Sequence, residues 1–215
     1  MEQQNSGISA VVLGTMQDGG LPHSGCECPR WQSAFKNPAL AGYAASLALI
    51  DWRGDRSAVW IIDATPDIKW QLAMLAEELG PHEQRDGRLR QPDGLFLTHA
   101  HLGHIDGLAQ FGPEAMAVQD LPLYGTRPLI RLLLETALWR PMTLRLMMRP
   151  IVPGEAVTLA PGLSITAVPV PHRDEWDVGT VAYRVEGPRK SLLYLPDIDS
   201  WDLWPEAREH LETVN

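Results

Sequence analysis

Short apolar runs, separated by glycine, proline and aspartate, recur along the chain and predict β-strands. These runs are rich in β-branched and aromatic residues, which fit the pleated surface of a sheet. The predicted strands cover residues 8–15, 46–51, 58–63, 94–98, 121–125, 163–170, 180–186 and 191–197. The stretch TLRLMMRP, residues 143–150, lacks a clear strand pattern and is interpreted as a partly buried loop.

Helical periodicity is limited to a few segments between the strands. The clearest is residues 66–79, where apolar residues recur on one face, Thr65 is the expected N-cap and Gly80 follows the last turn. Trp70 is expected to face the core from this helix. Further helices are expected over residues 127–139 and 204–214 and in a short segment after residue 104. Because helices interrupt the strands, the pattern predicts a mixed α/β fold in layers, with chemistry at the strand ends.

The composition fits one globular domain that spans residues 1–215. The chain is 45% hydrophobic and 21% charged, and no apolar segment is long enough to cross a membrane. A net charge of −9 argues against a general nucleic-acid-binding protein, which needs a basic face. The opening MEQQNSGIS lacks the basic and apolar regions of a secretory signal. We therefore expect a cytoplasmic protein with a small-molecule substrate and no membrane partner.

Three of the seven histidines lie within six positions, in the stretch LFLTHAHLGHIDGL, residues 95–108. His99 and His101 follow an apolar strand, in which alternate residues share a face, and His104 comes as the chain turns into the next element. Imidazole binds zinc, iron, copper and nickel, and a catalytic zinc site commonly has three protein ligands and one open position. The spacing therefore predicts that the three histidines converge on one metal ion.

Three more candidate site residues each follow a predicted strand directly. They are Asp63 in WIIDATPD, His172 in VPVPHRDE and Asp197 in LLYLPDIDS. With the histidine cluster, His172 and Asp197 supply enough donors for two metal ions with Asp197 between them, an arrangement that can hold attacking and leaving oxygens. Taken singly, His172 is as well explained as a loop or core residue, and Asp197 as the cap of a turn.

In this order, these residues resemble the ligand set of the metallo-β-lactamase fold hydrolases. In that family a strand that ends in aspartate is followed by an H-x-H-x-D-H motif, a single histidine, a bridging aspartate and a last histidine. The counterparts here are Asp63, the stretch HAHLGH, His172 and Asp197. The resemblance implies a four-layer αββα sandwich with one or two zinc ions at one edge of two packed sheets, iron or manganese being alternatives.

Within that family the chain is most similar to the pyrroloquinoline quinone biosynthesis B proteins and to the cyclic phosphodiesterase of phosphonate breakdown. The similarity includes VVLGTMQDGGLPHSGCECPRW near the start and PHRDEWDVGTVAYRVEGPRKSLLYLPDIDSW near the end. It implies that Asp197 bridges or orients a metal-activated water and that His172 completes the coordination or assists the leaving group. Asp63 is then expected to hydrogen-bond a ligand histidine and set its tautomer.

Two departures from the family pattern affect the predicted centre. Gly103 replaces the motif aspartate that ligates the second ion, as in a glycine-containing subgroup with the same PHRDE and PDID stretches. The last strand and histidine of the family do not follow Asp197, so the second half of the sandwich is expected to be incomplete. The chain is then a fragment, a truncated product or one completed by a partner, and its exposed strand edge favours a homodimer.

A third departure concerns a possible structural metal site near the N-terminus. The relatives have three cysteines there, and Trp31 stands where the third would be. Cys26, Cys28 and His23 remain as candidate ligands, one short of a tetrahedral zinc set. The alternative is an ordered loop with two free thiols.

The leading interpretation is a metal-dependent hydrolase that activates water for attack on an ester, amide or phosphodiester. An alternative is a non-haem iron oxygenase or hydroxylase, because two histidines and a carboxylate are typical iron ligands. The resemblance to the quinone-cofactor proteins agrees with that alternative. A third is a metal-free binding protein that retains the histidines as a relic, which Gly103 and the length of the chain suggest. The identity of the metal distinguishes the first two, and a well-folded protein without metal would support the third.

Overall fold

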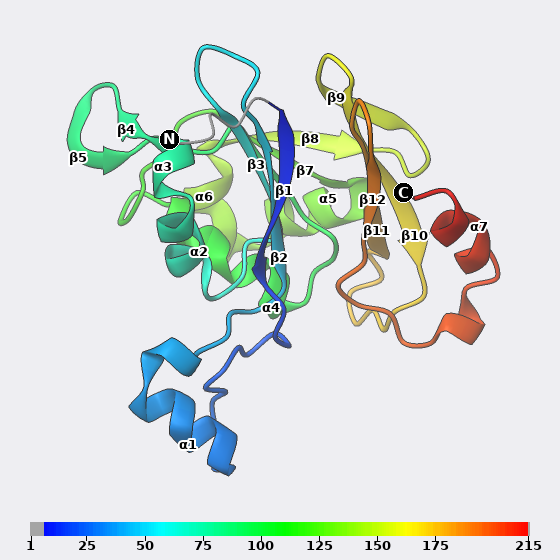
Figure 1. Ribbon diagram of the computed structural model, residues 1–215, viewed down its shortest axis with the longest axis horizontal. Helices are drawn as coiled ribbons and strands as arrows, with labels where there is room; N and C mark the ends of the chain where they lie inside the picture. The colour runs from blue at the N-terminus through cyan, green and yellow to red at the C-terminus, as the bar shows by residue number, and fades with distance from the viewer. Residues whose placement is uncertain (1–6, 215) are drawn as a thin grey trace.

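Two β-sheets pack face to face and carry helices on their outer faces (Figure 1), so the four-layer αββα prediction is confirmed. The computed structural model describes residues 7–214. The six-stranded sheet has the order β1-β2-β3-β6-β7-β8, the four-stranded sheet the order β12-β11-β10-β9, and β4-β5 form a separate hairpin. The bounds are Ile8–Gly14 (β1), Ser46–Asp51 (β2), Ala58–Ile62 (β3), Pro81–His82 (β4), Arg85–Leu89 (β5), Gly94–Phe96 (β6), Leu121–Thr126 (β7), Leu146–Ile151 (β8), Ala156–Ala160 (β9), Leu163–Val170 (β10), Thr180–Glu186 (β11) and Ser191–Tyr194 (β12).

The central strands are apolar on both sides because both faces of the six-stranded sheet are covered. β2 reads SLALID and is buried throughout. Leu47 and Leu49 belong to the apolar cluster that joins the two sheets, whereas Ala48 and Ile50 belong to the cluster under the helices. Successive residues of a strand point to opposite faces, so one uninterrupted apolar run contributes to both clusters.

Helices cover the outer face of the six-stranded sheet, and a short C-terminal helix lies beside the four-stranded sheet (Figure 1). The helices are α1 (Pro29–Lys36), α2 (Ile68–Met74), α3 (Ala76–Leu79), α4 (Leu102–Ile105), α5 (Arg127–Glu135), α6 (Arg140–Thr143) and α7 (Ala207–Glu212), with 3-10 turns at Pro38–Leu40, Asp106–Phe111, Ala137–Trp139 and Trp201–Leu203. α1 projects away from the two sheets (Figure 1). Among residues 7–214, no helix has the length and apolar character needed to cross a bilayer.

The helix predicted over residues 66–79 consists of two short helices and begins later than expected. Asp67 occupies the N-cap position of α2, so the prediction of Thr65 at that position is wrong. Thr65 instead accepts a hydrogen bond at Oγ1 from the Asp67 backbone N–H (3.1 Å). Trp70 is 50% exposed, so its predicted core position is also wrong. The buried residues of α2 are Ile68, Gln71 and Leu72, and Trp70 lies to one side of the stripe that they form.

Residues 143–150, expected to form a loop, instead contribute most of β8 at the edge of the six-stranded sheet. β8 pairs in parallel with β7, from Leu121 opposite Leu146 to Thr126 opposite Ile151. Its exposed Arg149 and neighbouring methionines give no period-two pattern, because only some of its side chains are buried. Parallel pairing with a strand that precedes it by a whole helix is a tertiary contact, so local sequence did not predict this strand.

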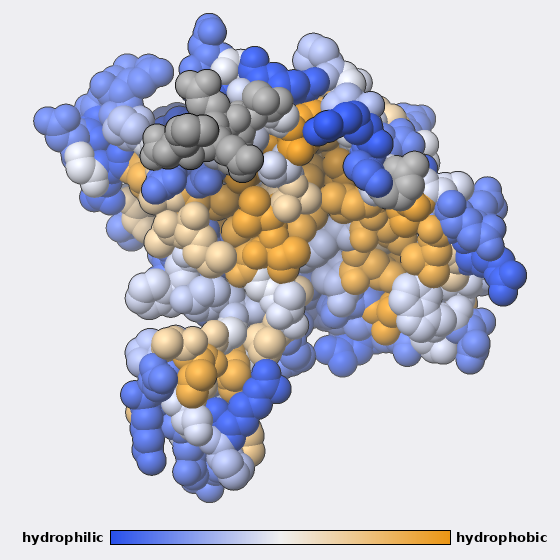
Figure 2. Space-filling model, in the orientation of Figure 1, coloured by the Kyte–Doolittle hydropathy of each residue, from blue (hydrophilic) through white to orange (hydrophobic). Residues whose placement is uncertain are grey.

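The strands β1 and β12 are edge strands, since each has a neighbour on one side within its sheet. A groove with a volume of about 840 Å³ lies between them, with Ile8 and Ala10 on one wall and Val185 and Leu192 on the other. Figure 2 shows apolar surface over β1 and over the four-stranded sheet beside it. Association of two copies through such an edge stays a prediction.

Tyr183 ties the two sheets together next to the candidate site, and its hydroxyl is a test of that packing. The residue is fully buried, and its hydroxyl donates to the backbone oxygen of Leu97 (2.8 Å). Tyr183→Phe is expected to lower the free energy of unfolding by about 1–2 kcal/mol, because the buried carbonyl loses its partner. Urea unfolding measures this loss. Tyr124→Phe, which keeps the ring stacked on Phe96, should change stability by less than about 0.5 kcal/mol, and an equal loss in both variants would contradict the assignment.

Candidate metal centre

The candidate site residues come together because they follow strands that end at the same edge of the sandwich. Asp63 follows β3, and His99 and His101 follow β6, which is parallel to β3. His172 follows β10 and Asp197 follows β12, and these two strands run in the same direction because each is antiparallel to β11. The loops after all four strands therefore meet at one edge, the usual place for a ligand site in a layered α/β fold.

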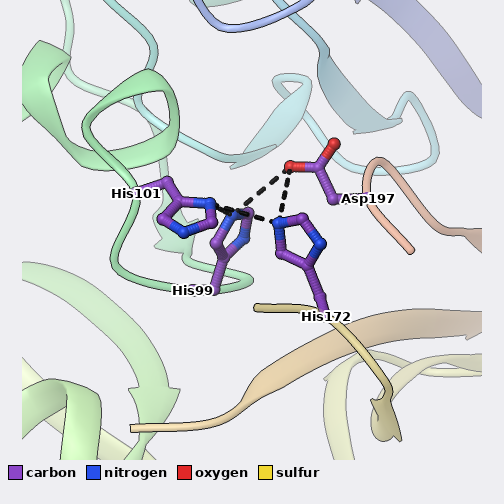
Figure 3. Close-up of side chains that lie close together, drawn as sticks. All are labelled: His99, His101, His172 and Asp197. Atoms are coloured by element: carbon purple, nitrogen blue, oxygen red, sulfur yellow. Dashed lines mark hydrogen bonds and ion pairs between the residues drawn. The ribbon is translucent and has the colours of Figure 1, made fainter. Parts of the chain in front are cut away.

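His99, His101, His172 and Asp197 form a first group in which the side chains point toward one another (Figure 3). Nδ1 of His101 lies 2.9 Å from Nε2 of His99 and 3.2 Å from Nε2 of His172. Oδ2 of Asp197 lies 3.3 Å from Nε2 of His99 and 3.8 Å from Nε2 of His172. Two nitrogen ligands of a tetrahedral zinc ion are about 3.4 Å apart. The spacing of these donor atoms therefore suits one metal ion between them.

Asp18, His104 and Asp197 form a second group beside the first. Nε2 of His104 lies 2.9 Å from Oδ2 of Asp197 and 3.5 Å from Oδ1 of Asp18. Oδ2 of Asp197 thus takes part in both groups, as an oxygen shared between two ions would. The His104 side chain is 2% exposed, and its Nε2 has no hydrogen-bond partner within the described part of the chain. A buried ring nitrogen therefore faces the two carboxylates.

The structure divides the three histidines of the HAHLGH stretch between the two groups, although their spacing predicted convergence on one ion. His99 and His101 belong to the first group, and His104 belongs to the second. The physical reason is the helix α4, which begins directly after His101. The turn of this helix carries His104 into the second group. In the first group, His172 from the second sheet is the third histidine.

Each of the four histidines turns its other ring nitrogen to an oxygen outside the two groups. The pairs are His99 Nδ1 with Thr98 Oγ1 (2.9 Å), His101 Nε2 with Glu175 Oε2 (2.7 Å), His104 Nδ1 with Asp63 Oδ2 (2.8 Å) and His172 Nδ1 with Asp199 Oδ1 (2.8 Å). An N–H that donates outward leaves the lone pair of the inner nitrogen free, and metal-binding histidines commonly have this arrangement. These outward hydrogen bonds, like the spacing of the donor atoms, therefore fit a metal ion bound by the inner nitrogens.

Asp63 holds two of these histidines in place, His104 directly and His99 through Thr98. Its buried carboxylate accepts hydrogen bonds from the backbone N–H and the hydroxyl of Thr98 (both 2.9 Å) and from His104. The Thr98 hydroxyl, which donates to Asp63, can in turn accept from Nδ1 of His99. Asp63 has a φ of 68°, a left-handed conformation that non-glycine residues adopt rarely and mostly where surrounding contacts enforce it.

Burial and the carboxylates act in opposite directions on the pKa values of the centre. Burial lowers the pKa of His99. Burial also acts to lower the pKa of His104, but the charge of Asp63, the hydrogen bond to Asp63 and the close contacts with Asp18 and Asp197 outweigh it and raise the pKa to about 12. Burial acts to raise the pKa of Asp197, yet its close contacts with His104 and His99 hold that pKa far below the usual range. The carboxylates thus favour a positive charge among them, carried by a proton or a metal ion.

Asp18, Glu175 and Asp199 are site residues that sequence reasoning missed. Asp199 stands two positions after Asp197, and Glu175 stands three positions after His172. Both therefore lie in stretches that carry the family resemblance, Asp199 in PDIDS and Glu175 in PHRDE. An acid so close in sequence to a candidate ligand is a signal from which both could have been predicted. Asp18 lies within the N-terminal stretch VVLGTMQDGG, but it is about 80 positions from the histidine motif, so only the fold places it in the centre.

The candidate ligands of a structural metal near the N-terminus are only two thiols that lie close together. The sulfur atoms of Cys26 and Cys28 lie 3.2 Å apart. His23 does not complete a set of three donors with them, since no such group occurs there among residues 7–214. Nδ1 of His23 lies 2.8 Å from the backbone oxygen of Ser24 instead. Metal binding by the two thiols stays a prediction.

Comparison with known families agrees with this fold and this centre. Residues 60–215 match the Beta-lactamase superfamily domain. The match covers well over half of the chain, so the chain belongs to this family.

Among curated proteins, the chain is similar to Coenzyme PQQ synthesis protein B from several bacteria. The protein from Rhodopseudomonas palustris is 29% identical over 177 residues, which cover 79% of this chain and 54% of that protein. The protein from Methylobacterium radiotolerans is 28% identical over 209 residues, which cover 88% of this chain and 65% of that protein. The chain thus spans between half and two thirds of the length of these relatives.

Two solved structures share the fold clearly. Zn²⁺-bound PqqB from Methylobacterium extorquens has a TM-score of 0.75 at 24% identity, covering 93% of this chain and 68% of that one. A structure described as a new diphosphatase from the PhnP family has a TM-score of 0.60 at 23% identity, covering 83% of this chain and 61% of that one. At these identities the two structures show a common architecture.

Proposed function

We propose that this protein is a metal-dependent hydrolase that cleaves an ester, amide or phosphodiester bond of a small molecule. The observation that carries the proposal is the convergence of donor atoms from His99, His101, His172 and Asp197 at spacings that suit one ion. Zinc fits this set, because imidazole and carboxylate are its common ligands in catalytic sites. Membership in the Beta-lactamase superfamily supports hydrolytic chemistry.

The chemical roles of the residues follow from their contacts. A bound divalent ion supplies the Lewis acidity that activates a water molecule at neutral pH. The Asp197 side chain is 28% exposed, so its carboxylate can orient that water by accepting a hydrogen bond from it. His172 is held by Asp199 through Nδ1 and keeps Nε2 turned to the group. Trp176 is 43% exposed beside His101, where its ring offers an apolar surface to an organic substrate.

The test of the proposal combines metal content with an activity panel. Protein purified without added metal or chelator is analysed for metal, then assayed on aryl phosphodiesters, diphosphates, aryl esters and β-lactams. Zinc or manganese at one or more ions per chain, together with turnover of at least one class that a chelator abolishes and zinc restores, is the expected result. Diphosphates are included because the PhnP-family neighbour is described as a diphosphatase. A chain that binds zinc but turns over none of these substrates would contradict the proposal.

A second candidate function is oxygen-dependent hydroxylation at a non-haem iron. It is favoured by the similarity to proteins named for coenzyme PQQ synthesis and by the availability of two histidines and Asp197 as an iron set. Iron in the purified protein, with oxygen consumption on a tyrosine-derived or peptide substrate, would replace hydrolysis by this function. A well-folded protein that takes up no metal would instead support a metal-free binding role.

A further inference from the structure

We infer that Asp18 is a ligand of a second metal position and supplies, from the N-terminal turn, the carboxylate that the histidine motif lacks at Gly103. The second position consists of Asp18, His104 and Asp197. The inference rests on the proposed function in one respect, because Asp197 also belongs to the first group. It concerns a different ion, however, and metal binding tests it without any assay of activity.

Gly103 and Asp18 occupy complementary space. A Cβ atom at position 103 would lie 2.3 Å from both Cβ and Cγ of Asp18 and 2.7 Å from its Oδ2. Atoms that are not bonded do not approach so closely, so the Asp18 side chain fills the volume where a side chain at position 103 would begin. An aspartate at 103 and an aspartate at 18 are therefore alternatives in space, and glycine at 103 makes room for the acid from the other segment.

The turn that carries Asp18 is held in place by backbone hydrogen bonds. The Gly20 N–H donates to the backbone oxygen of Gln17 (2.7 Å), so Asp18 lies in the middle of a tight turn. Before the turn, the Met16 N–H donates to Tyr43 (2.9 Å), and after it the Leu21 N–H donates to Gly42 (2.7 Å). The turn is thus anchored on both sides to the segment that leads into β2, and its position beside α4 is a consequence of the fold.

The unpartnered Nε2 of His104 points to a ligand in this position. It is buried, it makes no hydrogen bond within the described residues, and it lies within 3.5 Å of an oxygen of Asp18 and 2.9 Å of one of Asp197. Its Nδ1 is engaged by Asp63. One imidazole and two carboxylates form a donor set for zinc, manganese or iron, with further positions open to water or substrate.

The test measures metal binding in a reciprocal exchange of the two positions. The variants are Asp18→Ala, Gly103→Asp and the double variant Asp18→Gly/Gly103→Asp, titrated with Zn²⁺ by calorimetry and with Co²⁺ by visible absorption. The unmodified chain is expected to bind two ions. Asp18→Ala should retain the first and bind the second at least about 100-fold more weakly, since even an outer partner of a ligand is worth 10–100-fold. The double variant should recover the second ion, because the new side chain enters the vacated volume.

Controls separate the role of Asp18 from a general effect of the substitutions. Asp86→Ala removes an exposed acid from the hairpin strand β5 and should leave both ions in place. Gly103→Asp alone puts two acids into one volume and should lower the thermal midpoint, which the double variant should restore. Two ions bound by Asp18→Ala with unchanged affinity would overturn the inference. One ion bound equally by the unmodified chain and by Asp18→Ala would overturn it and leave the proposed function standing, whereas no zinc in the unmodified chain would overturn both.

Discussion

Replacement of His101 by alanine is expected to weaken zinc binding at the first position by more than about 100-fold and to abolish hydrolysis. Nδ1 of His101 is the donor closest to both His99 and His172, at 2.9 and 3.2 Å. Its loss leaves two imidazoles and one carboxylate, and the ion then lacks a strong ligand on the side of the loop after β6. Zinc content after dialysis and a competition titration with a chromophoric chelator measure the change.

The matched control for this variant is His82→Ala. His82 lies in the β4-β5 hairpin, where its Nδ1 accepts a hydrogen bond from the Gln84 N–H (3.0 Å), outside either donor group. The same imidazole is removed, so zinc content and activity should stay those of the unmodified chain. Far-ultraviolet circular dichroism of both variants shows whether the fold is retained. A folded His101→Ala protein with full zinc occupancy would refute the assignment of the first position.

The buried strands were predictable from the sequence because a buried strand needs apolar residues, which form a recognisable local pattern. β2, β3 and β10 carry uninterrupted or alternating apolar residues, and each lies within a residue of its predicted bounds. The apolar pattern is weaker in β8 and β9 because they are edge strands with exposed side chains. Their places depend on pairing with β7 and β10, and a pairing partner is not visible in a local pattern.

The candidate site was predictable as far as chemistry follows strand ends. Each of four residues, Asp63, His99, His172 and Asp197, comes directly after an apolar run, and the fold brings all four to one edge. The division of the histidines between two groups was not predictable, because it depends on the direction in which α4 turns the chain. Asp18 was missed for a related reason, since its proximity to Gly103 is a contact between segments far apart in sequence.

The tautomers of the histidines connect the fold to the chemistry of the centre. Every outward ring nitrogen faces an oxygen acceptor, and three of those acceptors are carboxylates. A carboxylate accepts hydrogen bonds only, so it fixes the N–H on its own side of the ring. The inner nitrogens are then unprotonated in neutral imidazole, as metal binding requires. Metal binding should therefore depend on the acceptor as well as on the ligand, and replacing an acceptor carboxylate by an amide tests this dependence.

Replacement of Asp63 by asparagine is expected to weaken the second metal position by about 10–100-fold in a protein that still folds. The amide oxygen can keep the two hydrogen bonds from Thr98, which places the amide NH₂ group toward Nδ1 of His104. That group donates, so Nδ1 must accept and the proton moves to Nε2, the atom that faces Asp18 and Asp197. Zinc titration measures the affinity, and nitrogen-15 NMR of the imidazole ring reports the tautomer.

Two further variants separate this tautomer effect from a loss of stability. Asp63→Ala leaves the N–H groups of Thr98 and His104 buried without an acceptor and should lower the free energy of unfolding by about 3–5 kcal/mol, more than Asp63→Asn. Asp51→Asn weakens another largely buried carboxylate, paired with Arg53 at 2.7 Å at the other end of β2, and should keep both ions. If Asp63→Asn bound zinc at both positions with unchanged affinity, the proton on His104 would not be under the control of Asp63. In that case, the buried carboxylate beneath the centre would serve only to hold Thr98 in place.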